Sequence, residues 1–148
     1  MKIMNKKGFT LVELLAVIVV LAIIMIIAVP SVMDSMNSAR KNAFKIYAQK
    51  VLNTAQTKYQ ADILTGGEIK NCYSLQTLMG SSVGNYKGFV QITGANTDTV
   101  SFTITLRDNN YYIGGQDYSS LEGNINNRGT NKITYPTGCE KKSTETND

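Results

Sequence analysis

The segment GFTLVELL at residues 8–15 opens the stretch that decides the fold, and the unbroken apolar run LLAVIVVLAIIMIIAV at residues 14–29 completes it. Between positions 9 and 29 the one charged side chain is that of Glu13. A helix over these positions is roughly 30 Å long at 1.5 Å per residue, which matches the hydrocarbon thickness of a bilayer. We therefore expect a membrane-spanning helix over residues 9–29.

Basic residues are concentrated before this helix. Three of the fifteen Lys and Arg residues, at positions 2, 6 and 7, precede Gly8. Such a flank stays in the cytoplasm, so we expect the chain after Val29 to lie outside. Without residues 1–8 the chain carries twelve basic and eleven acidic side chains. This balance provides no broad positive surface, and we expect no specific nucleic-acid site.

The position of the apolar run argues against an ordinary secretory signal. Such a signal ends in small residues at its cleavage site, but here the run ends at Ala28-Val29-Pro30-Ser31. A proline beside the scissile bond restricts the extended backbone that a peptidase needs. An uncleaved signal anchor remains an alternative.

The short basic leader, the octet at residues 8–15 and the apolar helix together resemble the class III signal of type IV pilins and pseudopilins. The resemblance covers residues 1–35 in detail. It implies that a prepilin peptidase cuts after Gly8 and methylates the new amino terminus at Phe9. A glycine suits the cleavage site, since without a Cβ its backbone can lie close against the enzyme.

The resemblance also gives roles to Glu13 and Pro30. Glu13 would neutralise the terminal amine of Phe9 on a neighbouring subunit and so set the axial register, because an unpaired buried charge is strongly penalised. Its alternative is a carboxyl close enough to the interface to reach water or take up a proton. Pro30 would bend the helix, as pilin prolines do at this position, or would mark the exit from the bilayer.

A second apolar pattern extends the helix to about Leu64. Apolar residues recur at steps of three and four along one side, at Phe44, Ala48, Val51, Leu52, Ala55, Tyr59 and Ile63. This spacing predicts a core-facing stripe. Gly66-Gly67 then predicts the end of the helix.

After the helix the period changes to two. Residues 100–107 alternate apolar and polar side chains, and residues 88–92 and 111–113 are expected to pair with them as antiparallel strands. Segment 65–86 should connect helix to sheet with a short helical turn, 116–131 should be a loop, and 132–135 an edge strand. The fold class is α+β: a long N-terminal helix on an antiparallel sheet of three to four strands, the pilin fold.

The chain has two cysteines, Cys72 and Cys139, and no histidine. In an oxidising exterior we expect them to form a disulfide, with two buried thiols as the alternative. The predicted organisation is a cleaved leader (1–8), a membrane and filament-core helix (9–29), an amphipathic helix (30–64), a globular head (65–139) and a flexible tail (140–148).

The chain shows no motif for catalysis, and we expect no enzyme activity, cofactor or metal. Asp117 and Glu122 in a Gly/Asn-rich loop offer at most a weak calcium site. Four tyrosines, among them Tyr118, could form an exposed aromatic surface, although core or rim positions are more usual for them.

The resemblance implies a structural subunit of a type IV pilus, a helical homopolymer used for adhesion, motility or DNA uptake. Its partners would be the prepilin peptidase/N-methyltransferase, the pilus assembly platform and minor pilins. It would lie in the cytoplasmic membrane before assembly and on the cell surface afterwards. The alternatives are a pseudopilin of a type II secretion or competence system and an unassembled membrane-anchored adhesin.

Overall fold

The computed structural model describes residues 9–81, 83–95, 97 and 99–139. The predicted leader with Gly8 and the predicted tail at 140–148 lie outside the described residues. The chain divides into two compact units, one up to Arg40 and one from Lys41 onward, and each is described by itself. The element order is one long helix, a short strand, a short helix and four further strands.

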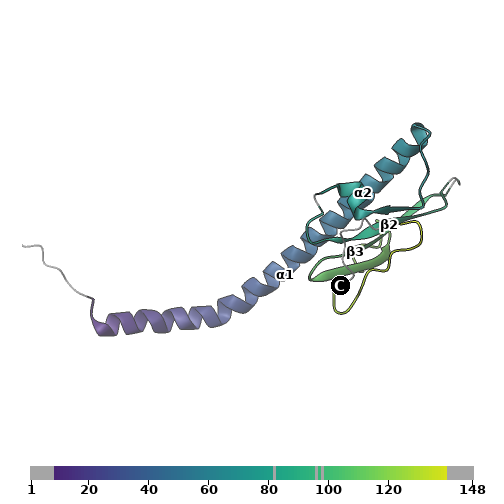
Figure 1. Cartoon of the computed structure of the whole chain (residues 1–148). Coiled ribbons are helices and arrows are strands. Elements are labelled where there is room, and N and C mark those ends of the chain that lie inside the picture. Colours follow the sequence, from purple (N-terminus) through teal and green to yellow (C-terminus); the bar gives the residue numbers. More distant parts are fainter. Residues whose placement is uncertain (1–8, 82, 96, 98, 140–148) are drawn as a thin grey trace, which may run out of the picture. The chain divides into compact units, whose positions relative to one another are not determined.

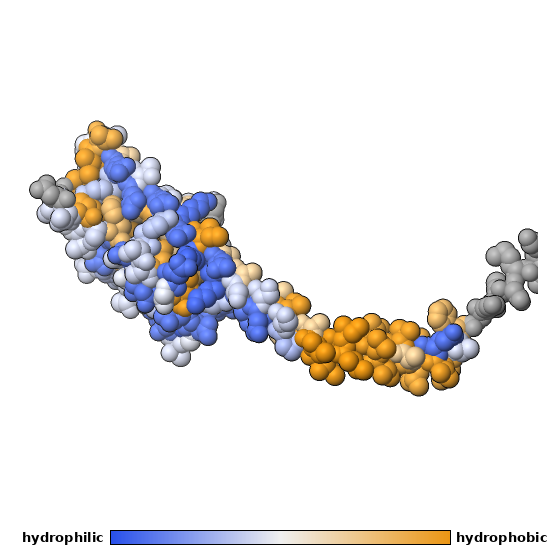
Figure 2. All heavy atoms as spheres, turned by 180° about the vertical axis from the view of Figure 1, so that it is seen from behind, coloured by the Kyte–Doolittle hydropathy of each residue, from blue (hydrophilic) through white to orange (hydrophobic). Residues whose placement is uncertain are grey.

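The first unit consists of the N-terminal part of helix α1, which runs from Leu11 to Leu64 (Figure 1). All residues from 9 to 40 are exposed, although most of those before Pro30 are apolar. Figure 2 shows the apolar side chains as an almost continuous covering of this segment. The helix is long and apolar enough to cross a membrane and is a candidate membrane anchor.

The second unit contains the remainder of α1 packed against a sheet. The helix contributes a buried stripe of Phe44, Ala48, Val51, Leu52, Ala55 and Tyr59. This stripe confirms the predicted core face over most of its length. Ile63 was wrongly included, because its side chain lies 46 % exposed near the end of the helix, beyond the area that the sheet covers.

Helix α1 ends in a glycine turn, as predicted. The N–H of Gly66 donates to the carbonyl of Ile63 at 3.2 Å, and the N–H of Gly67 donates to that of Asp62 at 2.8 Å. This pair of bonds is a Schellman motif, which requires a left-handed residue. Gly66 supplies it with a φ of 67°.

The sheet has five strands rather than the predicted three to four. All neighbours pair antiparallel, in the order β1-β2-β3-β4-β5. The strands are β1 Cys72–Ser74, β2 Lys87–Thr93, β3 Ser101–Arg107, β4 Tyr111–Gln116 and β5 Asn126–Asn127. The additional strands are β1 and β5, which have three and two residues, too few to show an alternating pattern. The predicted short helical turn is α2, Leu75–Met79.

The alternation along the strands separates two apolar clusters. Tyr73, Val90, Ile104 and further side chains join the helix stripe in the main core. Phe89 belongs to a smaller cluster with both cysteines. Neighbouring residues on a strand face opposite sides, so the two clusters draw on opposite faces of the sheet.

The chain end covers the smaller cluster. Ile133 and Tyr135 pack against it, and the rings of Tyr135 and Phe89 lie 5.5 Å apart. The predicted edge strand at 132–135 was wrong: this segment has no strand pairing and attaches through side chains. The predicted loop at 116–131 was too long, because Gln116 ends β4 and β5 lies within it.

A disulfide joins Cys72 of β1 to Cys139, with Cα atoms 5.2 Å apart and a sequence separation of 67. It connects the first strand after the helix to the last described residue. The bond therefore closes a loop that contains the whole sheet.

A polar contact fastens β1 to the end of the helix. The hydroxyl of Tyr73 donates to Asp62 Oδ2 at 2.5 Å, and Lys58 Nζ lies 3.2 Å from Asp62 Oδ1. The Tyr73 hydrogen bond, helped by Lys58, lowers the pKa of Asp62 below its ordinary value. Burial, followed by the contact with Asp62, raises the pKa of Tyr73.

Removal of the disulfide should destabilise the second unit without changing its fold. A loop of this length corresponds to roughly 4 kcal/mol of denatured-state entropy, and measured losses are typically about 2–5 kcal/mol. Urea unfolding of the full chain in detergent, followed by tyrosine near-UV circular dichroism, compares the wild type with Cys72→Ser/Cys139→Ser. Equal midpoints and slopes would contradict this role.

The Asp62 contact predicts a pH dependence. A carboxyl whose pKa is lowered in the folded state stabilises fully above its unfolded pKa of about 4, and that contribution disappears as the pH falls through the folded pKa. The stability difference between wild type and Asp62→Asn should therefore be larger at about pH 6 than at about pH 3. The other carboxyls are the same in both proteins, so their contribution to the pH dependence cancels in this difference. A stability difference that does not change with pH would rule out the contact.

Candidate functional site: the amino-terminal signal

Thr10 and Glu13 form a reciprocal hydrogen-bonded cap at the start of α1. The backbone N–H and the hydroxyl of Thr10 donate to Glu13 Oε2 at 2.9 and 2.7 Å. In return, the backbone N–H of Glu13 donates to Thr10 Oγ1 at 3.3 Å. With Thr10 as the N-cap and Glu13 three residues later, this is a capping box, which satisfies two backbone donors that the first turn leaves unpaired.

The cap explains how an acid is tolerated at this place. A carboxylate in the first turn also interacts favourably with the positive end of the helix dipole. Glu13 is thus partly compensated within its own chain before any second molecule is present. Within the described residues its other oxygen, Oε1, has no hydrogen bond or ion pair and is free to accept one.

The residue that the predicted cleavage would make terminal lies next to this cap. Phe9 precedes Thr10 and is 85 % exposed. Cleavage after Gly8 would convert its backbone amide into a charged amine, four residues from Glu13 along the chain. An amine and a carboxylate near one apolar helix end can form a charge-assisted hydrogen bond.

Thr10 is the member of this site that sequence analysis missed. The signal was present, since Thr followed three residues later by Glu before an apolar run is the sequence pattern of a capping box.

Pro30 lies inside α1, which is helical on both sides of it. The proline has no N–H to donate to the carbonyl four residues earlier, so one helical bond is missing there.

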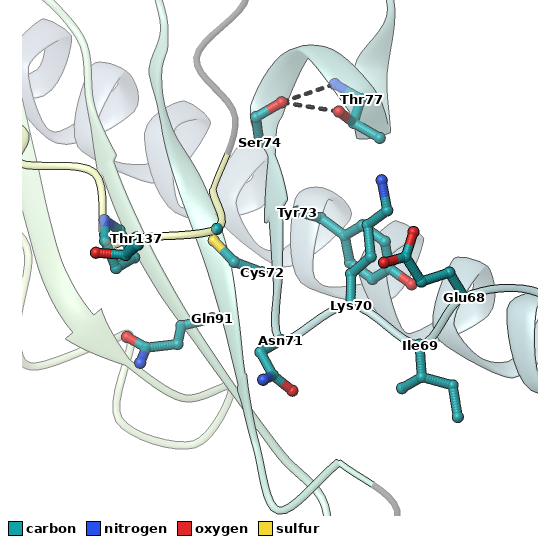
Figure 3. A pocket seen from close by; sticks show the side chains of 12 residues that line it. Glu68, Ile69, Lys70, Asn71, Cys72, Tyr73, Ser74, Thr77, Gln91 and Thr137 are labelled. Atoms are coloured by element: carbon teal, nitrogen blue, oxygen red, sulfur yellow. Dashed lines mark hydrogen bonds between the residues drawn. The ribbon is translucent and has the colours of Figure 1, made fainter.

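The second unit has a polar hollow of about 420 Å³ beside the disulfide (Figure 3). Its wall includes Ser74 and Thr77, which bond each other as the cap of α2. The side chains of Lys70, Asn71 and Gln91 point in different directions rather than at a common point. The groups drawn in this hollow therefore show no arrangement suited to acid–base or nucleophilic chemistry.

The acids proposed for calcium are used in other contacts. Asp117 Oδ1 accepts bonds from the N–H and hydroxyl of Ser120 at 2.8 and 2.7 Å, which lower its pKa. Glu122 forms an ion pair with Lys45 of α1 at 2.9 Å. Among the described residues no group of three or more potential metal ligands occurs.

Comparison with known protein families gives a match at the amino terminus. Residues 3–29 match the family model described as the prokaryotic N-terminal methylation motif. No curated protein and no solved structure matches the chain significantly. The matched stretch contains Gly8, Phe9, Thr10 and Glu13. The chain carries a class III prepilin signal, and this signal is consistent with a type IV pilin-like protein.

Proposed function

We propose that this protein is a structural subunit of a type IV pilus, cleaved after Gly8, methylated at Phe9 and polymerised through the N-terminal half of α1. The observation that carries the proposal is the match at residues 3–29, together with the exposure of every side chain from Phe9 to Val29. The motif indicates a structural subunit processed by a prepilin peptidase.

The apolar segment requires an apolar environment. Each Leu, Ile or Val removed from water contributes about 1.5–3 kcal/mol, so residues 9–29 must lie in a bilayer or among other helices. Both environments are comparably apolar, and moving the helix from lipid to a helix bundle yields little further hydrophobic free energy. We expect polar groups and shape to decide how the helices align.

Glu13 is the polar group that the segment offers. An ionised acid at the centre of a membrane helix costs about 3 kcal/mol on insertion scales, and less near the interface. The cap from Thr10 uses Oε2 and leaves Oε1 for the amine of Phe9 on a neighbouring subunit. Such a pair forms only at one axial offset between two helices, because an unpaired buried charge is penalised. In this proposal Glu13 sets the register.

The second candidate is a pseudopilin of a secretion or competence system, which would use the same signal and the same helix packing. The signal favours neither system. A membrane-anchored adhesin that never assembles would retain Met1 and would not need Glu13 to be charged.

The register role is tested by Glu13→Gln, which keeps the size of the side chain and removes its charge. We expect this variant to be cleaved normally, because the residues at the cleavage site are unchanged, but to give at least about tenfold fewer sheared surface fibres, corresponding to the loss of 1.4 kcal/mol or more per subunit contact. Immunoblots of whole cells and sheared fractions measure both quantities.

Glu13→Asp is the matched control, because it keeps the charge on a shorter side chain and should assemble better than Glu13→Gln. Gly8→Val reports on cleavage alone and should leave the full-length precursor in the membrane. Normal fibre yield from Glu13→Gln would refute the register role.

A further inference from the structure

The second unit leaves large apolar side chains exposed in two places. Among its described residues these are Ile46, Ile63, Leu64 and Tyr118, with exposed fractions of 64, 46, 86 and 51 %. Ile63 and Leu64 form one group at the end of α1, which we call the tip. Ile46 and Tyr118 border a single shallow hollow on another part of the unit.

The hollow lies where the loop between β4 and β5 meets the outer face of α1. Its volume is about 470 Å³. Besides Ile46 and Tyr118 it is lined by Gln49, Lys50, Asn53, Thr54 and Thr57 of α1. The hollow therefore has the apolar side chains of Ile46 and Tyr118 at its border. Its remaining lining consists of Lys50 and uncharged polar side chains.

The loop that carries Tyr118 is held in place. The bonds from Ser120 to Asp117 fix its first turn, and the ion pair between Glu122 and Lys45 ties it to the helix. Leu121 is fully buried in the core. A surface held in this way loses little conformational entropy when a partner binds, which favours association.

The tip is equally well defined. The glycine turn at Gly66 and Gly67 fixes the backbone directly after Leu64. A leucine exposed over 86 % of its surface at such a rigid end has no packing role within its own unit. From Ile46 to Leu64 the axial separation along α1 is roughly 27 Å.

One charged side chain near each place carries a charge opposite to the other. Lys50 lines the hollow, and Glu68 follows the tip by four residues. Neither side chain has an ion pair within the described part of the chain. A tip placed in the hollow of another copy would bring opposite charges into the same interface, which favours the correct partner over others.

We propose that the Ile63–Leu64 tip of one copy inserts into the Ile46–Tyr118 hollow of the next copy. This inference rests on the proposed function and adds the contact between heads. The two surfaces differ, so the contact is heterologous: every copy uses its tip on one neighbour and its hollow on another. Contacts of this kind propagate into open filaments when rotation does not close a ring.

Cysteine cross-linking in assembled fibres tests the contact. Both native cysteines are in the disulfide, so the wild type offers no free thiol. The full chain carrying Ile46→Cys and Leu64→Cys is assembled, sheared from cells and treated with a short bismaleimide. We expect a ladder of covalent dimers, trimers and higher species on a denaturing gel.

The single variants and a displaced pair serve as controls. Ile46→Cys alone and Leu64→Cys alone should stay monomeric, because a heterologous contact never brings two identical positions together. Leu64→Cys with Asn127→Cys, which lies exposed in β5, should also give no ladder.

Two outcomes would overturn the proposal. Fibres that form normally but give no ladder would rule out the proposed contact without contradicting the proposed function. Dimers from a single variant would indicate a symmetric contact instead. A wild type that forms no fibres under any condition would overturn the proposed function together with this contact.

Discussion

A single carboxylate, that of Glu13, in the otherwise uncharged segment 9–29 is the constraint on which the proposed behaviour of this molecule depends. Residues 9–29 cannot remain in water, yet Glu13 cannot be buried without a partner. The capping box with Thr10 offers a local solution, since it pairs one carboxylate oxygen with the start of the helix. The remaining oxygen makes the segment suited to partners that bring a positive charge to a fixed position.

The second unit is stabilised independently of this segment. Its core, its polar fastening between Asp62 and Tyr73 and its disulfide all lie at or after Lys41. In the proposed function it would therefore keep one structure while the apolar segment passes from lipid to a bundle of helices. That separation is what the proposed function requires of a subunit that is first anchored and later polymerised.

Long, periodic elements were predictable from the sequence, and short or tertiary features were not. Helix α1 and strand β3 were expected because many residues repeat one pattern, and Gly66 marked the end of the helix. β5 has only two residues, so pairing with β4 rather than its own pattern defines it. Tyr135 looked like a strand residue, but its ring packs on Phe89 without a backbone ladder. In the signal, the charge of Glu13 stands out in an apolar run, whereas its bond to Thr10 is indicated only by the weaker Thr-x-x-Glu spacing.

The proposed function requires that the chain is cut after Gly8 and built into a fibre through the helix that follows. Mass spectrometry of the amino-terminal peptide from sheared surface fibres tests it most directly. We expect a peptide that begins with N-methylated Phe9. A protein that retains Met1, or that begins after residue 28 as an ordinary secretory signal would leave it, would contradict cleavage after Gly8.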